Sequence, residues 1–93
     1  MNDQELARQI VAHLGGDGPN NYAAYAIVID GFAHWMPAEK LVNDWRVAGA
    51  MLDKVHDLPE PYKWITVMRD IRRIPLGDPL ERAINEACDK ALS

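Results

Sequence analysis

An Asp-Gly pair between two apolar runs constrains the fold of this chain more than any other feature. Asp30-Gly31 stands between the runs at residues 22–29 and 32–35. A type I′ turn needs positive φ at both central residues, and Asp-Gly adopts that conformation readily, so the segment predicts a β-hairpin. Both sides of the first strand are apolar, and we therefore expect helices to cover both faces of the sheet.

The segment Asp3–Leu14 predicts a helix before the hairpin. Asn2 is a suitable N-cap, and Glu5 stands three residues later, as in a capping box. Apolar residues recur along the segment with a helical period. Gly15 is well placed to end the helix.

A second helix is predicted after Pro37, with Asn43 as its N-cap. Its apolar stripe includes Trp45, which we therefore assign to the core. An earlier start, at Pro37, is the alternative. Gly49 lies inside this helix, where glycine costs about 1 kcal/mol relative to alanine. A close approach of helix and sheet would offset that cost.

The last helix has the clearest signals. Asp78 is placed as its N-cap, Pro79 as its first residue and Glu81 as the capping-box residue. An apolar stripe then continues along residues 80–92 and includes Cys88.

Residues 62–74 fit two structures. Trp64, Val67 and later apolar residues follow a helical period, whereas Ile65-Thr66-Val67 is β-branched and favours a strand. We predict a strand over residues 63–69. The element order is then α-β-β-α-β-α. This is an α+β fold in which a small antiparallel or mixed sheet, the hairpin plus one strand, is covered by three helices as a layered sandwich.

Length and composition indicate a single domain over residues 1–93, with an ordinary hydrophobic fraction of 48%. A chain this short buries only about 60–65% of its unfolded surface. Self-association into a homo-oligomer would therefore add to its stability. The net charge of −4 argues against a nucleic-acid partner.

Cysteine usage and the polar start of the chain favour a cytoplasmic protein. Cys88 is the single cysteine, so an internal disulfide is excluded, and no signal-peptide pattern is present. No apolar run approaches the roughly 20 residues of a membrane span. We expect no association with a membrane.

The sequence contains no recognisable catalytic set, and we expect a protein that is not an enzyme. The three histidines form no metal-binding motif, and no cofactor motif is present. Ser93 is the single serine, which excludes a serine hydrolase. Cys88 lies on an apolar stripe, as expected for a buried structural thiol.

Two groups of residues are candidates for binding a partner or a ligand. Trp35 and Trp64 lie near predicted strand ends, where an exposed indole could stack on a base or anchor a protein. Packing in the core is the alternative for both. Arg69, Arg72 and Arg73 could bind a phosphate or a carboxylate. The alternative for the arginines is a solvated edge that discourages aggregation.

Two segments carry a resemblance to a known family. Residues 41–54 read Leu-Val-Asn-Asp-Trp-Arg-Val-Ala-Gly-Ala-Met-Leu-Asp-Lys, and residues 79–92 read Pro-Leu-Glu-Arg-Ala-Ile-Asn-Glu-Ala-Cys-Asp-Lys-Ala-Leu. Together they resemble the small bacteriophage ABA-sandwich proteins, a group that includes the NinX-like proteins. The resemblance implies a phage or prophage origin and an α-β-α layered fold. It implies no reaction and no catalytic residues.

From these observations we expect a phage accessory protein that binds a host protein without catalysis, for example in anti-defence or host takeover. The alternative is a protein that binds or sequesters a small anionic ligand, such as a nucleotide signal, in an oligomer.

Overall fold

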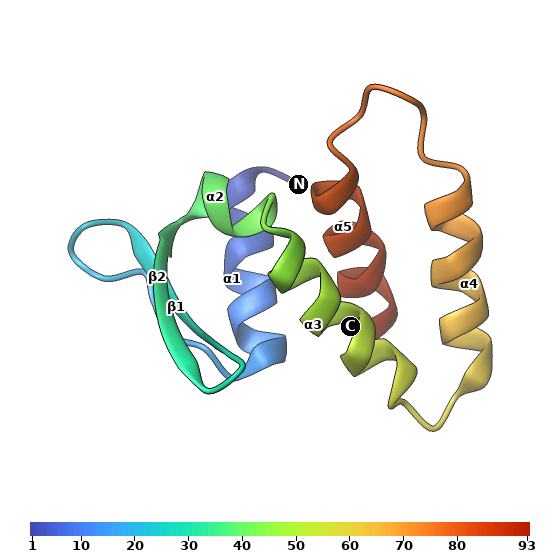
Figure 1. Cartoon of the computed structure of the whole chain (residues 1–93), viewed down its shortest axis with the longest axis horizontal. Helices are drawn as coiled ribbons and strands as arrows, with labels where there is room; N and C mark the ends of the chain where they lie inside the picture. The colour runs from blue at the N-terminus through green and yellow to red at the C-terminus, as the bar shows by residue number, and fades with distance from the viewer.

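The computed structural model describes all 93 residues and confirms an α+β fold, with five helices and one two-stranded antiparallel sheet (Figure 1). The elements in chain order are α1 Asp3–Leu14, β1 Ala24–Ile29, β2 Phe32–Pro37, α2 Ala38–Val42, α3 Trp45–His56, α4 Pro61–Arg72 and α5 Leu80–Leu92. The hairpin lies at one end of the molecule and α4 at the other, and the two make no contact. One core collects buried residues from every helix and both strands.

The first helix forms as its end signals predict. The Asn2 side chain accepts a hydrogen bond from the Glu5 backbone N–H at 2.8 Å, and Gly15 ends the helix with a φ of 73°. The buried face of α1 contacts β1. There the Tyr25 hydroxyl donates to Oε1 of Gln4 at 2.7 Å, which satisfies the hydroxyl of a fully buried ring.

The predicted hairpin is confirmed, but only one of its faces is covered. Asp30 and Gly31 both have positive φ, 53° and 83°. Tyr25 pairs with Met36, and both are buried against the helices. The expectation that both faces are covered is wrong, because Val28 on the opposite face is 65% exposed. Figure 1 shows the helices on one side of the hairpin only.

The predicted strand over residues 63–69 is wrong, because this stretch belongs to helix α4. Pro61 occupies the start of the helix, where its missing N–H costs nothing. Val67 is fully buried, and Trp64 and Met68 pack against the core from neighbouring turns. A strand would have divided these residues between two faces.

Helices α2 and α3 replace the single helix predicted after Pro37. Asn43 was predicted as an N-cap, but it ends α2, and its Nδ2 donates to the Glu39 carbonyl at 2.8 Å. Asp44 caps α3 instead, because its side chain accepts hydrogen bonds from the backbone N–H groups of Arg46 and Val47. Trp45 was assigned to the core and is 72% exposed. It lies about a quarter turn from the centre of the buried stripe of α3.

The last helix packs among the other four but begins without a side-chain cap. Asp78 was predicted as the N-cap, with Pro79 as the first residue and Glu81 in a capping box. The helix begins at Leu80, Pro79 is the capping residue, and no side chain accepts a hydrogen bond there. The three-helix layered sandwich is not confirmed, since α5 contacts the other four helices and none covers the outer face of the hairpin.

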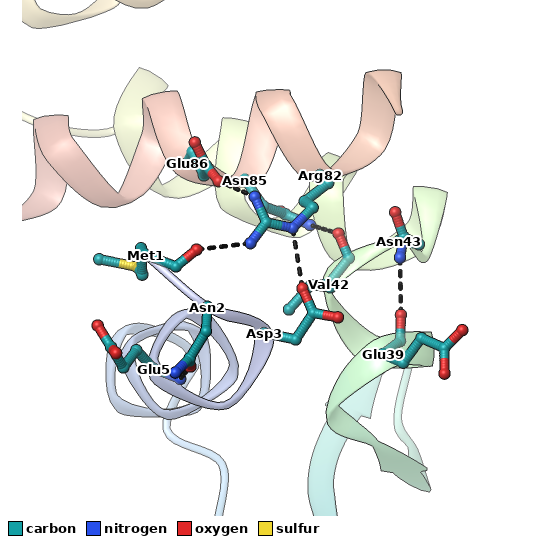
Figure 2. Close-up of polar contacts among 10 residues, drawn as sticks. All are labelled: Met1, Asn2, Asp3, Glu5, Glu39, Val42, Asn43, Arg82, Asn85 and Glu86. Carbon is teal, nitrogen blue, oxygen red and sulfur yellow. Dashed lines mark hydrogen bonds and ion pairs between the residues drawn. The ribbon is translucent and has the colours of Figure 1, made fainter. Parts of the chain in front are cut away.

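Polar residues of α5 tie it to α1 and α2 (Figure 2). Arg82 donates from Nε to Oδ1 of Asp3 at 2.9 Å and from Nη2 to the Met1 carbonyl at 2.7 Å. Asn85 is fully buried, and its Nδ2 donates to the Val42 carbonyl at 3.0 Å. The Arg82 bonds join α5 to the start of the chain, and the Asn85 bond joins α5 to the last residue of α2.

Candidate functional site

The structure divides the predicted binding residues between two distant surfaces. Trp35 lies on β2, whereas Trp64, Arg69 and Arg72 lie on α4 and Arg73 follows its last turn. In Figure 1, β2 and α4 occupy opposite ends of the molecule. One ligand as small as a nucleotide cannot contact Trp35 and the α4 residues of the same copy.

The residues on α4 line one open groove of about 420 Å³ on the outer side of the helix. We call this surface the α4 groove, and its lining residues are Trp64, Ile65, Met68, Arg69 and Arg72. They recur at helical spacing, so a single face of α4 presents all of them. Ile65 is 65% exposed, which gives the groove an apolar surface open to solvent. Arg73 does not line the groove.

Trp64 is held in position from the neighbouring helix. The imidazole of His56, the last residue of α3, meets the indole edge to face, with ring centroids 5.2 Å apart and planes at 87°. The indole is half-buried and packs against the core. Part of the ring thus braces α4 on α3, and the rest lines the α4 groove.

The two arginines of the groove are free of intramolecular ion pairs. Arg69 and Arg72 are exposed, and no carboxylate lies within 4 Å of either guanidinium. By contrast, Arg82 is engaged with Asp3. An unpaired guanidinium beside apolar side chains keeps its fork of donors available for a carboxylate or a phosphate.

A second depression, at the other end of the molecule, was not predicted. Its eight lining residues come from β2, α2 and the start of α3, and they include Trp35, Met36 and Trp45. The prediction missed it because Trp45 was placed in the core. Trp45 directly follows the capping residue Asp44. This position at the start of α3 is the signal that could have predicted an exposed indole.

Asp44 and Arg46 form a fixed ion pair at the edge of this second depression. Arg46 donates from Nη2 to Oδ2 of Asp44 at 2.9 Å and from Nε to Oδ1 at 3.2 Å. The side-chain hydrogen bond from Arg46 lowers the pKa of the Asp44 carboxyl below its ordinary value, and the backbone N–H groups of α3 act in the same direction. Arg46 is therefore occupied, unlike the arginines of the α4 groove.

The nucleophilic and metal-binding residue types are either buried or dispersed. Cys88 is fully buried, as predicted, and burial raises the pKa of its thiol to about 12. His13 is hydrogen-bonded to Asp89 rather than to a hydroxyl or a thiol. No three side chains of histidine, cysteine, aspartate or glutamate come close enough together to hold a metal ion. None of the helices combines the length and the apolar character that a membrane span requires.

Comparisons of the chain with protein-family models, with curated proteins and with solved structures find no match.

Proposed function

We propose that this protein is a phage accessory protein that acts without catalysis, by binding a host protein through the α4 groove. The observation that carries the proposal is the pair of unpaired guanidinium groups, Arg69 and Arg72, beside the exposed apolar side chain of Ile65. Tryptophan and arginine are the residue types that most often dominate the energy of protein interfaces.

The charges of the groove indicate what kind of partner segment would fit. The chain as a whole carries a net charge of −4, but the groove residues contribute two positive charges and no negative one. A partner segment with apolar side chains would pack on the apolar residues of the groove. At least one aspartate or glutamate of that segment would pair with Arg69 or Arg72. Repulsion from the rest of the surface would then oppose acidic proteins that do not reach the groove.

The phage origin is supported by the resemblance of residues 41–54 and 79–92 to the small phage proteins. These two segments cover the end of α2, most of α3 and all of α5, and α3 packs on α5. The resemblance thus concerns the scaffold. The α4 groove lies outside both segments, as expected if related scaffolds carry different binding surfaces.

A small anionic ligand is the second candidate, and the same groove favours it. Trp64 offers part of an aromatic face, and Arg69 and Arg72 could pair with phosphate oxygens. The groove is open along one side of a helix, whereas small-molecule sites usually enclose most of their ligand. This openness is why a protein partner is preferred.

Charge reversal at the groove tests the proposal. Tagged wild-type protein, Arg69→Glu and Arg72→Glu are each incubated with lysate of a bacterial host, and the bound proteins are quantified by mass spectrometry. Arg8→Glu is the matched control, because Arg8 is an exposed, unpaired arginine on α1 outside the groove. We expect one protein to be captured stoichiometrically by the wild type and the control, and capture to fall at least about tenfold in both groove variants.

The salt dependence tests the ion pair at the groove, and a ligand panel separates the two candidates. Binding of the captured protein should weaken between low and high salt, because an ion pair at the groove rim is screened. In parallel, the melting temperature is measured with inorganic phosphate and a panel of cyclic nucleotides. A shift that is lost in Arg69→Glu, with no stoichiometric protein captured, would transfer the proposal to a small ligand. If no protein is captured and no ligand shifts the melting temperature, the α4 groove does not have the proposed function.

A further inference from the structure

The hairpin has one open edge, which lies at the other end of the molecule from the α4 groove. The outer edge of β1 is already occupied by the preceding loop. Asp17 and Ala26 exchange two backbone hydrogen bonds, of 3.0 and 2.8 Å, and the Ala24 carbonyl accepts from the Asn20 N–H at 2.9 Å. Only β2 is left with an edge that has no neighbouring strand.

The register shows which backbone groups of β2 are open. In an antiparallel pair, opposite residues either bond to each other or both point away. Ala26 bonds outward to Asp17, so its partner Trp35 also directs its N–H and C=O away from the sheet. Ala33, two residues earlier, does the same. No protein group bonds to these outward N–H and C=O groups from loops or side chains.

Two large apolar side chains of β2 are exposed. Phe32 is 71% exposed and Trp35 is 55% exposed, and Trp45 stands beside the same end of β2. Edge strands are usually protected from pairing by lysine, by inward charges or by proline. Residues 32–36 contain no such device, and Pro37 stands only at the end of the strand.

We propose that the protein forms a two-fold symmetric dimer in which β2 pairs antiparallel with β2 of a second copy. With the symmetry axis at His34, Ala33 of each copy bonds to Trp35 of the other through the open N–H and C=O groups. The pairing joins two hairpins into one four-stranded sheet. Trp35 then lies against the small side chain of Ala33 of the second copy, which leaves room for the indole.

The same register gives Phe32 a place in the second copy. It falls opposite Met36 of that copy, and Met36 lines the depression that also contains Trp45. Because the interface is two-fold, the contact is made twice. One arrangement thus covers the exposed side chains of Phe32, Trp35 and Trp45 together.

Charge and area are compatible with a second copy as the occupant. β2 has no aspartate, glutamate, lysine or arginine, so no such charges are placed opposite each other despite the net charge of −4, and the residue that meets itself at the axis is His34. The charged residues at the depression balance to zero: Glu39, Lys40, Asp44 and Arg46. The three exposed aromatic side chains and the strand edge together would bury about 1,000 Å² over both copies, the lower limit for a specific interface. We therefore expect a dimer that dissociates in the micromolar range.

Two substitutions at the edge and one beside it test the pairing in the full-length protein. Ala33→Pro removes one outward N–H and leaves the β1–β2 bonds intact, and Trp35→Lys places a charge in the seam. Val28→Lys is the matched control, because Val28 lies on the same face of the sheet but one strand away from the seam. Far-UV circular dichroism and the melting temperature verify that each variant folds.

The mass in solution is measured by light scattering and native mass spectrometry from low micromolar to near-millimolar protein. The wild type and Val28→Lys should pass from monomer to dimer, whereas both edge variants should need at least about tenfold more protein to do so. Hydrogen exchange at the Ala33 and Trp35 amides should slow with concentration in the wild type. A wild type that stays monomeric, or a dimer that Val28→Lys disrupts as strongly as Trp35→Lys, would overturn the proposal. The Arg69→Glu variant should still dimerise, so the two proposals fail separately.

Discussion

Nε2 of His13 lies 2.7 Å from Oδ1 of Asp89 and joins the last turn of α1 to the last turns of α5. At the other end of the same helices, Arg82 bonds to Asp3. The two contacts show that α1 and α5 run parallel, with a polar pair at each end of their interface. Asp89 is only 5% exposed, so its carboxylate depends on His13 for a side-chain partner from another helix.

His13→Ala should destabilise the protein by about 2 kcal/mol, because it leaves the buried oxygen of Asp89 without that partner. Urea unfolding followed by circular dichroism measures the change in the free energy of unfolding. The double variant His13→Ala/Asp89→Ala is the control for coupling. It should lose less than the sum of the two single variants, since removing both partners leaves no unpaired buried group. Simple additivity would show that the pair contributes nothing.

Local signals in the sequence predicted α1 and the hairpin because their causes are local. The Asn2 side chain accepts a hydrogen bond from the backbone N–H three residues later, and Gly15 adopts a left-handed φ that other residues avoid. Asp30-Gly31 forms the turn by its own conformational preference. None of these interactions depends on what packs against the segment.

Helix α4 and Trp45 could not be predicted in this way because packing decides them. The β-branched run at residues 65–67 favours a strand, but a third strand would need a paired neighbour, and this stretch lies at the opposite end of the molecule from the hairpin. In the helix, the Thr66 hydroxyl donates to the Tyr62 carbonyl at 2.9 Å, so even its polar group is satisfied. In the sequence, Trp45 fits an apolar stripe of α3 as well as the buried residues do. Only the direction from which α5 approaches α3 selects the stripe that is buried.

The residues predicted to bind a partner or a ligand are divided between two surfaces. Trp64, Arg69 and Arg72 lie together on α4 as one groove, although they were assigned to a strand. Trp35 is exposed but belongs to the other end of the molecule, where Trp45 accompanies it. Composition singled out the aromatic and basic residues, whereas their grouping depends on the tertiary arrangement.

Asp44 should make the stability of the protein sensitive to acid. Its pKa is lowered in the folded state, chiefly by the side-chain hydrogen bond from Arg46. The carboxylate therefore stabilises the fold fully above its ordinary pKa of about 4, and this contribution is lost as the pH falls through the lowered value. Asp44→Asn keeps a side-chain acceptor for the N-terminus of α3 but has no titrating group.

Measured by urea unfolding, Asp44→Asn should lose less than about 1 kcal/mol at neutral pH, because ion pairs near the protein surface contribute little. Asp44→Ala should lose about 1 kcal/mol more, because it also removes the cap. As the pH falls below about 4, the gap between the wild type and Asp44→Asn should close. A constant gap across the acid range would contradict the proposed role of the carboxylate.

Two glycines should respond in opposite directions to the same substitution. A Cβ on Gly16 would collide with the carbonyl oxygen of Ala26, a backbone atom that the strand holds in place. Gly49 lies inside α3 with nothing within 4 Å of the Cβ position, so the close helix–sheet approach expected there is absent. Gly49→Ala should stabilise the protein by roughly 0.5–1 kcal/mol, since alanine is the better helix former.

Gly16→Ala should destabilise it by about 2 kcal/mol or more, because the loop that bonds to β1 must shift. Thermal unfolding of the two variants beside the wild type measures both effects. Equal melting temperatures for the two variants would show that the loop adjusts without cost.

Cys88 should be unreactive in the folded protein and should weaken the fold at high pH. Burial raises the pKa of its thiol from an ordinary 9.0 to about 12, so almost no thiolate is present at pH 8. A thiol reagent should therefore modify Cys88 only as fast as the protein opens, and urea should accelerate the reaction. Leu76→Cys provides the control, because this position is fully exposed and its thiol should react at the rate of free cysteine.

The stability follows from the same shift. Above pH 9 the unfolded chain loses the Cys88 proton while the folded chain keeps it, so the unfolded state is favoured increasingly up to about pH 12. In Cys88→Ala this source of alkaline sensitivity is absent, although the variant starts from a lower stability because it leaves a small cavity. The free energies of unfolding of the wild type and of Cys88→Ala should therefore converge as the pH rises from 9. Parallel curves, or rapid labelling of Cys88 in the native protein, would show that the thiol is reached by solvent without unfolding.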